Sequence, residues 1–226
     1  MKKLLGAALV LLALAGCAAP ATATFTDEDA QSVLFGQVTQ ASLKSLGFSP
    51  SSNTIATDSV KNYVAGVTDT AADVEPAECA NALRLLILTD QDADSTDTFY
   101  ALPNLTSGTT TVAVKARLFG SDDAAQKFIA DFQKANEGCP DFTATANGST
   151  DQVNVTVSEV ADESKGFRLD TVAGVDNEVL TYRTYIVREG NLAVAVQGAT
   201  KTDDDANLLV AASAAIYAQL TNGQAE

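Results

Sequence analysis

The sequence predicts an α+β fold, in which a mainly antiparallel sheet packs with helices in a single domain that follows a signal peptide. Two observations favour this fold. Short segments between residues 110 and 197 place apolar residues at every second position, as half-buried strands do. Segments with apolar residues at helical spacing stand before, within and after these strands. The resulting order is helices, a strand, a helix, several strands and a last helix, which is typical of an α+β domain.

The first sixteen residues have the pattern of a signal peptide. Lys2 and Lys3 precede the apolar stretch Leu4–Leu14, which is short of the roughly 20 apolar residues that a membrane-spanning helix needs. Leu14-Ala15-Gly16-Cys17 then matches a lipobox, in which cleavage makes Cys17 the first residue and acyl chains such as palmitate anchor it. The alternative is a plain secretory signal with an unrelated cysteine. We expect a lipoprotein anchored to the cell membrane on its extracytoplasmic face.

Residues 17–25 are small, polar and proline-bearing, which indicates a flexible tether, and residues 26–226 form the domain. The formal charge of the chain is −15, and loss of Lys2 and Lys3 with the signal peptide takes it to −17. Such an acidic protein repels nucleic acid and anionic lipid headgroups. Nucleic acid is therefore excluded as a partner.

Cys79 and Cys139 remain once Cys17 carries the lipid. An even pair in an oxidising compartment predicts a disulfide, and its loop of 60 positions should contribute about 4 kcal/mol to stability. Two free thiols are the alternative. Two distant thiols in a chain without histidine do not make a zinc pattern, so no metal site is expected.

Helices are predicted in the first part of the domain. Thr26 is a plausible N-cap because three acidic residues, Asp27–Asp29, follow it, and apolar residues at helical spacing continue towards Gly47. Pro76 introduces a second helix over Ala77–Thr89, because proline is favoured at an early helical position. The other segments of this part are a loop at Ser49–Asn53, a weakly helical stretch at 55–67 and an acidic, irregular stretch at 89–105.

The second part is mostly strands. Thr110–Phe119 alternates strictly and precedes a helix that Ser121 caps and Gly138 ends. A turn at Glu189-Gly190-Asn191 joins two alternating runs, which predicts a hairpin. Thr202 then caps a final helix. The expected strands after the Ser121 helix are Phe142–Ala146, Val153–Val157, Phe167–Val172, Glu178–Arg188 and Leu192–Gln197.

Few residues of the chain are candidates for chemistry. The absence of histidine excludes Ser-His-Asp and Cys-His catalysis. The acidic run Asp90–Ser95 begins like an EF-hand, but Ser95 replaces the required Gly and Ala101 the required Glu, so we interpret it as a solvated loop. Asp203–Asp205 suits the first turn of a helix better than a metal site. No catalytic residue, metal or cofactor is predicted.

Aromatic residues provide the remaining candidates. Tyr182 and Tyr185 lie on opposite faces of their strand, so at least one should be exposed, and with Arg183 they could line a ligand cleft. Four phenylalanines at helix and strand spacing are expected in the core instead; they are Phe119, Phe128, Phe132 and Phe142.

A family resemblance covers residues 76–220. The step Pro76-Ala77-Glu78-Cys79 precedes a strand and a helix rich in Ala and Phe that ends at Cys139; the hairpin Glu178–Gln197 and the Ala-rich helix Asp203–Leu220 close the segment. In this order of features the chain resembles the extracytoplasmic sensor domain of some actinobacterial serine/threonine kinases and of stand-alone sensor-domain lipoproteins.

The chain departs from that family at one motif, because the tryptophan usual before the second cysteine is Ala135 or Asn136 here. The kinase of the family also has a second disulfide, which this chain cannot form. The resemblance implies an α+β domain with a cleft for a small or lipidic ligand, and it implies no catalytic residues.

We therefore expect a non-enzymatic, lipid-anchored protein of the cell envelope that binds a ligand or an envelope protein without a cofactor. Two alternatives are open. An envelope lipid or glycolipid carrier would need a large apolar cavity under the sheet. A hydrolase would need two carboxylates that face each other in a cleft, about 5–9 Å apart.

Overall fold

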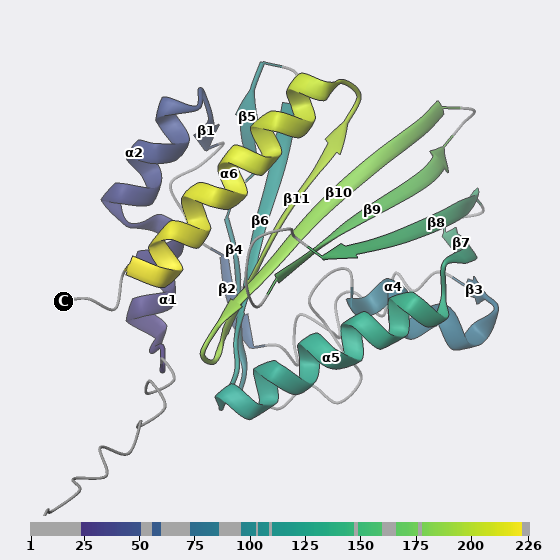
Figure 1. The fold of residues 1–226 in the computed structure, drawn as a ribbon, viewed down its shortest axis with the longest axis horizontal. Helices are drawn as coiled ribbons and strands as arrows, with labels where there is room; N and C mark the ends of the chain where they lie inside the picture. The colour runs from purple at the N-terminus through teal and green to yellow at the C-terminus, as the bar shows by residue number, and fades with distance from the viewer. Residues whose placement is uncertain are drawn as a thin grey trace, which may run out of the picture.

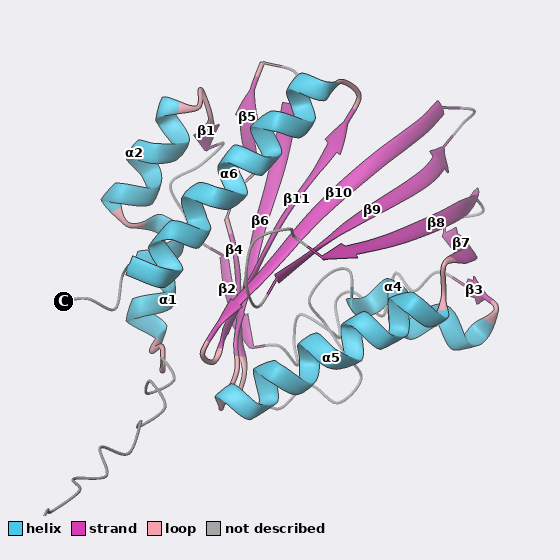
Figure 2. Cartoon of the chain, in the orientation of Figure 1, coloured by secondary structure: helices cyan, strands magenta, loops and turns pink. Residues whose placement is uncertain are grey.

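The computed structural model describes residues 24–50, 56–59, 73–85, 96–102, 104–108, 110–146, 149–159, 166–175 and 178–222. In this part of the chain one antiparallel sheet carries helices on both faces, which confirms the predicted α+β fold (Figures 1 and 2). The signal peptide, Cys17 and the acidic run Asp90–Ser95 lie outside the described residues.

The elements follow the predicted order, with additional short strands in the first half. The helices are α1 (Asp27–Phe35), α2 (Gln37–Ser45), the 3-10 helix η1 (Ala77–Cys79), α4 (Ala80–Leu85), α5 (Asp122–Gly138) and α6 (Asp203–Asn222). The strands are β1 (Ser49–Pro50), β2 (Ala56–Ser59), β3 (Asp73–Glu75), β4 (Thr98–Ala101), β5 (Leu105–Ser107), β6 (Thr110–Leu118), β7 (Asp141–Ala146), β8 (Ser149–Glu159), β9 (Gly166–Val175), β10 (Glu178–Glu189) and β11 (Leu192–Thr200).

The β10–β11 hairpin lies at the centre of the sheet. The strand order is β1–β5–β6–β11–β10–β9–β8–β7–β3, while β4 pairs with β6 and β2 pairs with β4. The hairpin register runs from Glu189 opposite Leu192 to Thr181 opposite Thr200. Gly190 in its turn has φ of 52°, a conformation that glycine adopts without strain. The turn and the hairpin predicted from the sequence are thus confirmed.

One face of the central strands packs against α1, α2 and α6. The alternation predicted for β6 is confirmed, because Val112, Val114 and Ala116 are fully buried on this face. Each buried aliphatic side chain contributes about 1.5–3 kcal/mol. The Tyr100 hydroxyl also donates a hydrogen bond to the Asp27 carboxylate, which joins β4 to α1. The stripe of α6 that completes this core consists of Leu209, Ala212, Ile216 and Leu220.

The opposite face packs against α4 and α5. The four phenylalanines expected in the core are all buried here, which confirms that prediction. The Phe128 ring lies 5.3 Å from Phe119 and 6.3 Å from Phe132, centroid to centroid. Arg117 of β6 enters the same core, with its guanidinium carbon 4.5 Å from the Phe119 centroid and 5.1 Å from that of Phe128.

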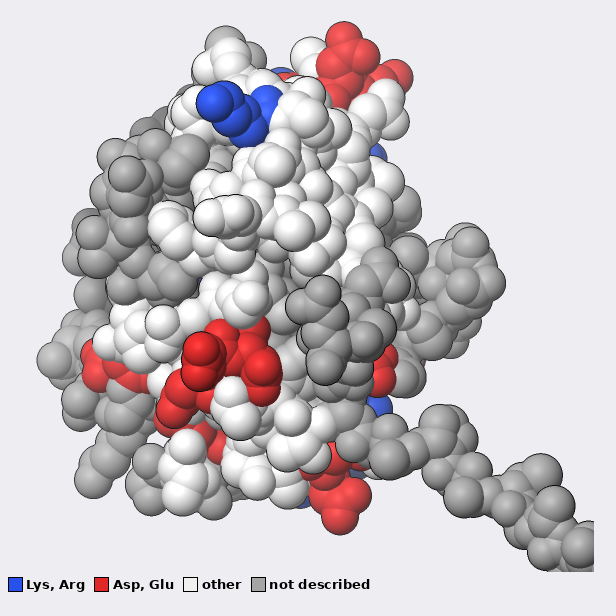
Figure 3. Space-filling model, turned by 90° about the vertical axis from the view of Figure 1, so that its left-hand side faces the viewer, with Lys and Arg blue, Asp and Glu red and all other residues white. Residues whose placement is uncertain are grey.

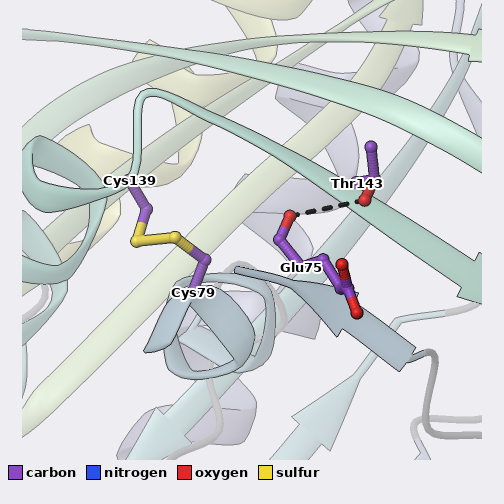
Figure 4. Close-up of a disulfide and its surroundings, with 4 residues drawn as sticks. All are labelled: Glu75, Cys79, Cys139 and Thr143. Carbon is purple, nitrogen blue, oxygen red and sulfur yellow. Dashed lines mark hydrogen bonds between the residues drawn. A yellow bond between two sulfur atoms is a disulfide. The ribbon is translucent and has the colours of Figure 1, made fainter. Parts of the chain in front are cut away.

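The predicted disulfide between Cys79 and Cys139 is present (Figure 4). It joins the end of η1 to the residue that follows α5, and both cysteines are buried. Nearby, β3 pairs with β7, and the Thr143 hydroxyl donates a hydrogen bond to the Glu75 carbonyl oxygen over 3.3 Å. The disulfide therefore holds the end strand of the sheet and η1 against α5.

The single helix expected from Thr26 to Gly47 is wrong, because Gly36 divides it into α1 and α2. Gly36 has an extended backbone, with φ of −60° and ψ of 158°. A side-chain carbon at Gly36 would lie 2.4 Å from the Ser32 carbonyl oxygen, so only glycine allows this close turn. The Thr39 hydroxyl donates to the Val33 carbonyl oxygen over 2.6 Å and holds the two helices together.

Further expectations need correction. Within the stretch 55–67 expected to be weakly helical, Ala56–Ser59 forms the strand β2, and the loop expected at Ser49–Asn53 begins with the strand β1. The stretch 89–105 is not wholly irregular, because Thr98–Ala101 forms β4 and pairs with β6. The helix expected over Ala77–Thr89 begins as the 3-10 turn η1 and continues as α4 to Leu85, and residues 86–89 lie outside the described residues. Pairing with the long strand β6 makes Thr98–Ala101 a strand, although apolar and polar residues hardly alternate in its own sequence.

Candidate functional site

A pocket of about 370 Å³ lies between the far end of the β10–β11 hairpin and the start of α6. It is polar: two side chains are cationic, one is acidic and three carry hydroxyl groups. The lining residues are Thr181, Arg183, Thr200, Lys201, Thr202 and Asp203.

The hairpin register positions the strand residues of this pocket. Thr181 pairs with Thr200, and Arg183 pairs with Gly198, on the antiparallel β10–β11 ladder. Because side chains alternate across a strand, Thr181 and Arg183 share the face on which α6 packs. The Thr200 hydroxyl donates a hydrogen bond to the Thr181 carbonyl oxygen over 3.2 Å. The floor of the pocket is therefore built on regular backbone.

Gly198 brings α6 close to this floor. A side-chain carbon at Gly198 would lie 3.0 Å from the Thr111 carbonyl oxygen and 3.3 Å from Cδ1 of Leu209 in α6. A larger residue would push the helix away from the sheet. Because Gly198 stands directly opposite Arg183, the sheet also presents no side chain at that position beside the guanidinium.

The first turn of α6 is capped within the chain. The Asp205 amide donates to the Thr202 hydroxyl oxygen over 3.1 Å, and the Thr202 amide donates to the Asp205 carboxylate over 3.0 Å. The same carboxylate accepts hydrogen bonds from the Lys201 amide and from the Thr110 hydroxyl. The Thr110 bond first, and the Thr202 bond next, hold the pKa of Asp205 below its ordinary value.

The three residues proposed for a ligand cleft occupy different places. Arg183 lines the pocket. Tyr185 is on the same face, but it is only 7 % exposed and belongs to the core beneath α6. Tyr182 lies half-buried on the opposite face, so the expected separation of the two tyrosines is confirmed. Across the neighbouring pair of strands, Asp170 of β9 stands opposite Arg183 in register.

Tyr182 shares the face where α5 packs with several other polar residues. In register, Thr184 stands opposite Gln197, which stands opposite Ala113, and Lys115 is the next residue of β6 on that face. The Thr184 side chain is fully buried and its hydroxyl has no hydrogen-bond partner among the described residues. Burial lowers the pKa of the Lys115 ammonium. These polar groups lie on the same face as the core beneath α5.

Sequence reasoning identified Arg183 but missed the residues that surround it. Thr202 and Asp203 were interpreted only as the start of a helix, and Lys201 was not singled out. The turn at residues 189–191 could have identified them. Residues at equal distances from a hairpin turn lie opposite each other on the two strands, and this rule pairs Thr181 with Thr200. The position of α6 over the sheet cannot be derived from the hairpin turn in the same way, because it depends on the packing of the helix against the strands.

The described residues contain no group of three or more His, Cys, Asp or Glu side chains that could hold a metal ion. In the same part of the chain, no helix has the length and apolarity to cross a membrane.

Comparison with known proteins shows a likeness of fold. No family model matches the sequence, and no curated protein matches it. Among solved structures, the chain is similar to the extracellular domain of PknH from Mycobacterium tuberculosis, with a TM-score of 0.58 and 14 % sequence identity. The alignment covers 87 % of this chain and 99 % of that domain. The two chains thus share a fold over most of their lengths.

Proposed function

We propose that the chain is a lipid-anchored, extracytoplasmic binding protein of the cell envelope, which holds a ligand in the pocket at Arg183. The observation that carries this proposal is a polar pocket of about 370 Å³ on a fold similar to an extracellular domain. A chain without histidine lacks the commonest general base, so binding suits these residues better than catalysis. A sensor-like role would follow if the bound form contacts a partner protein.

The attachment of the domain to its tether supports this arrangement. The Phe25 amide donates to the Asn191 side-chain oxygen over 2.7 Å, and the Asn191 side-chain nitrogen donates to the Phe25 carbonyl oxygen over 3.1 Å. The tether therefore meets the domain at the turn of the β10–β11 hairpin. At about 3.4 Å per residue, the pocket at Thr200 lies on the order of 30 Å farther along β11. The pocket thus lies at the end of the hairpin opposite to the turn where Phe25 joins the domain.

The polar lining also separates this proposal from the lipid-carrier alternative. A carrier needs an apolar cavity, whereas the pocket that the described residues line has charged and hydroxyl-bearing side chains. The hydrolase alternative needs two carboxylates in one cleft, and this pocket presents only that of Asp203.

Native mass spectrometry of the protein purified from its own envelope tests the binding function. A co-purifying mass should appear with the natural protein, should be lost with Arg183→Gln, and should persist with Lys134→Gln, which changes an exposed cation on α5. A ligand that stays bound to both variants would place binding elsewhere, and no bound mass in any sample would contradict the proposal.

The anchor has a separate test. Replacement of Cys17 by Ser should release the protein from the membrane fraction and abolish incorporation of labelled palmitate, because two or more acyl chains are needed for stable attachment. If the variant stays in the membrane or the natural protein takes up no label, the lipoprotein assignment is wrong.

A further inference from the structure

We infer that the sheet carries a second binding site, on the face where α5 packs, for a small organic molecule with a carboxylate group. Four polar side chains of three neighbouring strands form this site, and we call them the Lys115 cluster. They are Lys115 of β6, Gln197 of β11, and Thr184 and Tyr182 of β10. The inference goes beyond the proposed function, because the cluster lies on the opposite face of the sheet from the pocket at Arg183.

The register of the three strands places the members of the cluster next to one another. Gln197 stands opposite Thr184 on one side and opposite Ala113 on the other, and Lys115 is two residues from Ala113 along β6. Directly opposite Cβ atoms lie about 5 Å apart and diagonal neighbours about 7–8 Å, which long side chains span. Tyr182 follows on the same face of β10, two residues from Thr184. The three strands lie side by side in Figure 1.

The sheet itself offers the ends of this cluster no polar partner. Ala101 of β4 and Ala195 of β11 stand on either side of Lys115, and Ala199 stands opposite Tyr182. An alanine side chain has no atom that donates or accepts a hydrogen bond. The ammonium of Lys115 and the phenol of Tyr182 therefore point into rows that cannot pair with them.

The polar groups of the cluster are unused within the described part of the chain. The Thr184 hydroxyl is fully buried and has no hydrogen-bond partner there. Lys115 is half-buried without an ion pair to a described residue, and burial lowers the pKa of its ammonium. The side chains of Gln197 and Tyr182 likewise make no hydrogen bond to the described residues. An unpaired buried hydroxyl destabilises the fold, and a ligand that pairs with it recovers that loss.

The charge of the cluster favours a carboxylate. The formal charge of the chain is −15, or −17 without Lys2 and Lys3, and Figure 3 shows acidic side chains in separate groups on the side formed by α1, α2 and α6. On the α5 side, the Asp97 carboxylate is already paired with Arg117. Lys115 thus presents a single positive charge, which one carboxylate matches. A phosphate group carries up to about two negative charges and is held best by an arginine fork.

The neutral members of the cluster can recognise the rest of the ligand. The Thr184 hydroxyl, the Gln197 amide and the Tyr182 phenol each donate and accept hydrogen bonds. A ligand with a hydroxyl group beside its carboxylate would satisfy Lys115 and these neutral groups together. A 2-hydroxy acid is the simplest molecule of this kind, and lactate is the probe.

The test is isothermal titration of the mature, lipidated protein in neutral detergent with sodium lactate at constant ionic strength. Lactate should bind saturably, whereas uncharged lactamide and sodium phosphate should each bind about tenfold more weakly. Lys115→Met should weaken lactate binding about tenfold, because it removes a charge-assisted hydrogen bond. Lys134→Met removes an exposed cation of α5 and should leave the affinity unchanged.

Thr184→Val separates binding from a purely structural role. Valine has the shape of threonine without its hydroxyl, so the urea midpoint of the ligand-free protein should be unchanged or higher, because an unpaired buried group is removed. The affinity for lactate should nevertheless fall about fivefold. Thr106→Val, at an exposed position of β5, is the matched control and should change neither quantity.

The opposite outcomes are distinct. If lactate does not bind saturably, or if Lys134→Met weakens binding as much as Lys115→Met, the inferred site is wrong. A loss of stability in Thr184→Val with unchanged affinity would make the hydroxyl structural and overturn the inference. Tighter binding of phosphate than of lactate would overturn the carboxylate class. None of these results bears on the proposed binding function, which native mass spectrometry tests at Arg183.

Discussion

The Asn191 side chain pairs with the backbone of Phe25, a residue 166 positions earlier in the chain. Its oxygen accepts from the Phe25 amide, and its nitrogen donates to the carbonyl oxygens of Phe25 and Phe119, over 3.1 and 3.0 Å. Both Phe25 and Asn191 are buried. One amide thus satisfies three buried backbone groups and joins the entry of the domain to its central hairpin and to the end of β6.

Replacement of Asn191 by Ala should lower the free energy of unfolding by about 3 kcal/mol, because buried backbone groups lose their partners. Urea denaturation measures the change. Asn207→Ala on the exposed face of α6 is the matched control and should change stability by less than about 0.5 kcal/mol. Equal stability of the two variants would show that the Asn191 hydrogen bonds are not needed.

Arg117 and Asp97 form an ion pair in the core beneath α5. Their side chains are each 2 % exposed, and the Asp97 carboxylate accepts from Nε of Arg117 over 3.0 Å, from Nη2 of Arg117 over 2.7 Å and from the Gly120 amide over 3.0 Å. Arg117→Met should cost about 3–5 kcal/mol, since it leaves a buried carboxylate without its cation.

The exposed pair of Lys127 and Asp131 provides the comparison for that measurement. Their side chains are 71 % and 48 % exposed, so solvent screens the attraction. Lys127→Met should cost less than about 1 kcal/mol in the same urea titration. A similar loss for Arg117→Met and Lys127→Met would mean that burial does not decide the strength of the Arg117 pair.

Removal of the Cys79–Cys139 disulfide should lower the free energy of unfolding by about 4 kcal/mol, because the unfolded chain is freed from a loop of 60 positions. The double replacement by Ser and reduction of the natural protein should give the same midpoint of urea unfolding. Cys17→Ser is the control and should not change that midpoint. In hydrogen exchange, β3 and η1 should lose protection before the central hairpin does.

The lowered pKa of Asp205 predicts that the folded protein loses stability in acid. Its pKa is lower in the folded protein than in the unfolded chain, where an Asp titrates near about 3.9. The resulting stabilisation is complete above the unfolded pKa and is lost as the pH falls through the folded pKa. As the pH is lowered from about 5 to 2, the free energy of unfolding should therefore fall less steeply for Asp205→Asn than for the natural protein.

Asp204→Asn, at an exposed position of the same turn, is the control for this pH series and should follow the natural protein. Asp29, whose pKa is lowered by hydrogen bonds from the Thr26 amide and hydroxyl in α1, should behave like Asp205. Identical acid profiles of Asp205→Asn and the natural protein would remove the role assigned to the capping carboxylate.

The limits of sequence-based prediction are visible at Gly36 and at β4. Apolar residues at helical spacing continue from α1 into α2, so periodicity alone does not reveal the break at Gly36. Thr98–Ala101 becomes a strand because β6 offers it a partner, and that partner lies more than ten residues away in the sequence. Long-range pairing overrides weak local preference at such positions.

Local chemistry, which the sequence contains in full, determined the long elements together with several of their caps and the central turn, while strands such as β8 and β9 run beyond their predicted ends. The Ser121 and Thr202 caps, the alternation of β6 and β11, and the Gly190 turn depend on residues a few positions apart, and they were predicted correctly. Only the tertiary structure decided which side chains meet. Register and helix docking bring Arg183 to Lys201 and Asn191 to Phe25, because such contacts depend on the packing of whole elements and not on neighbours in the chain.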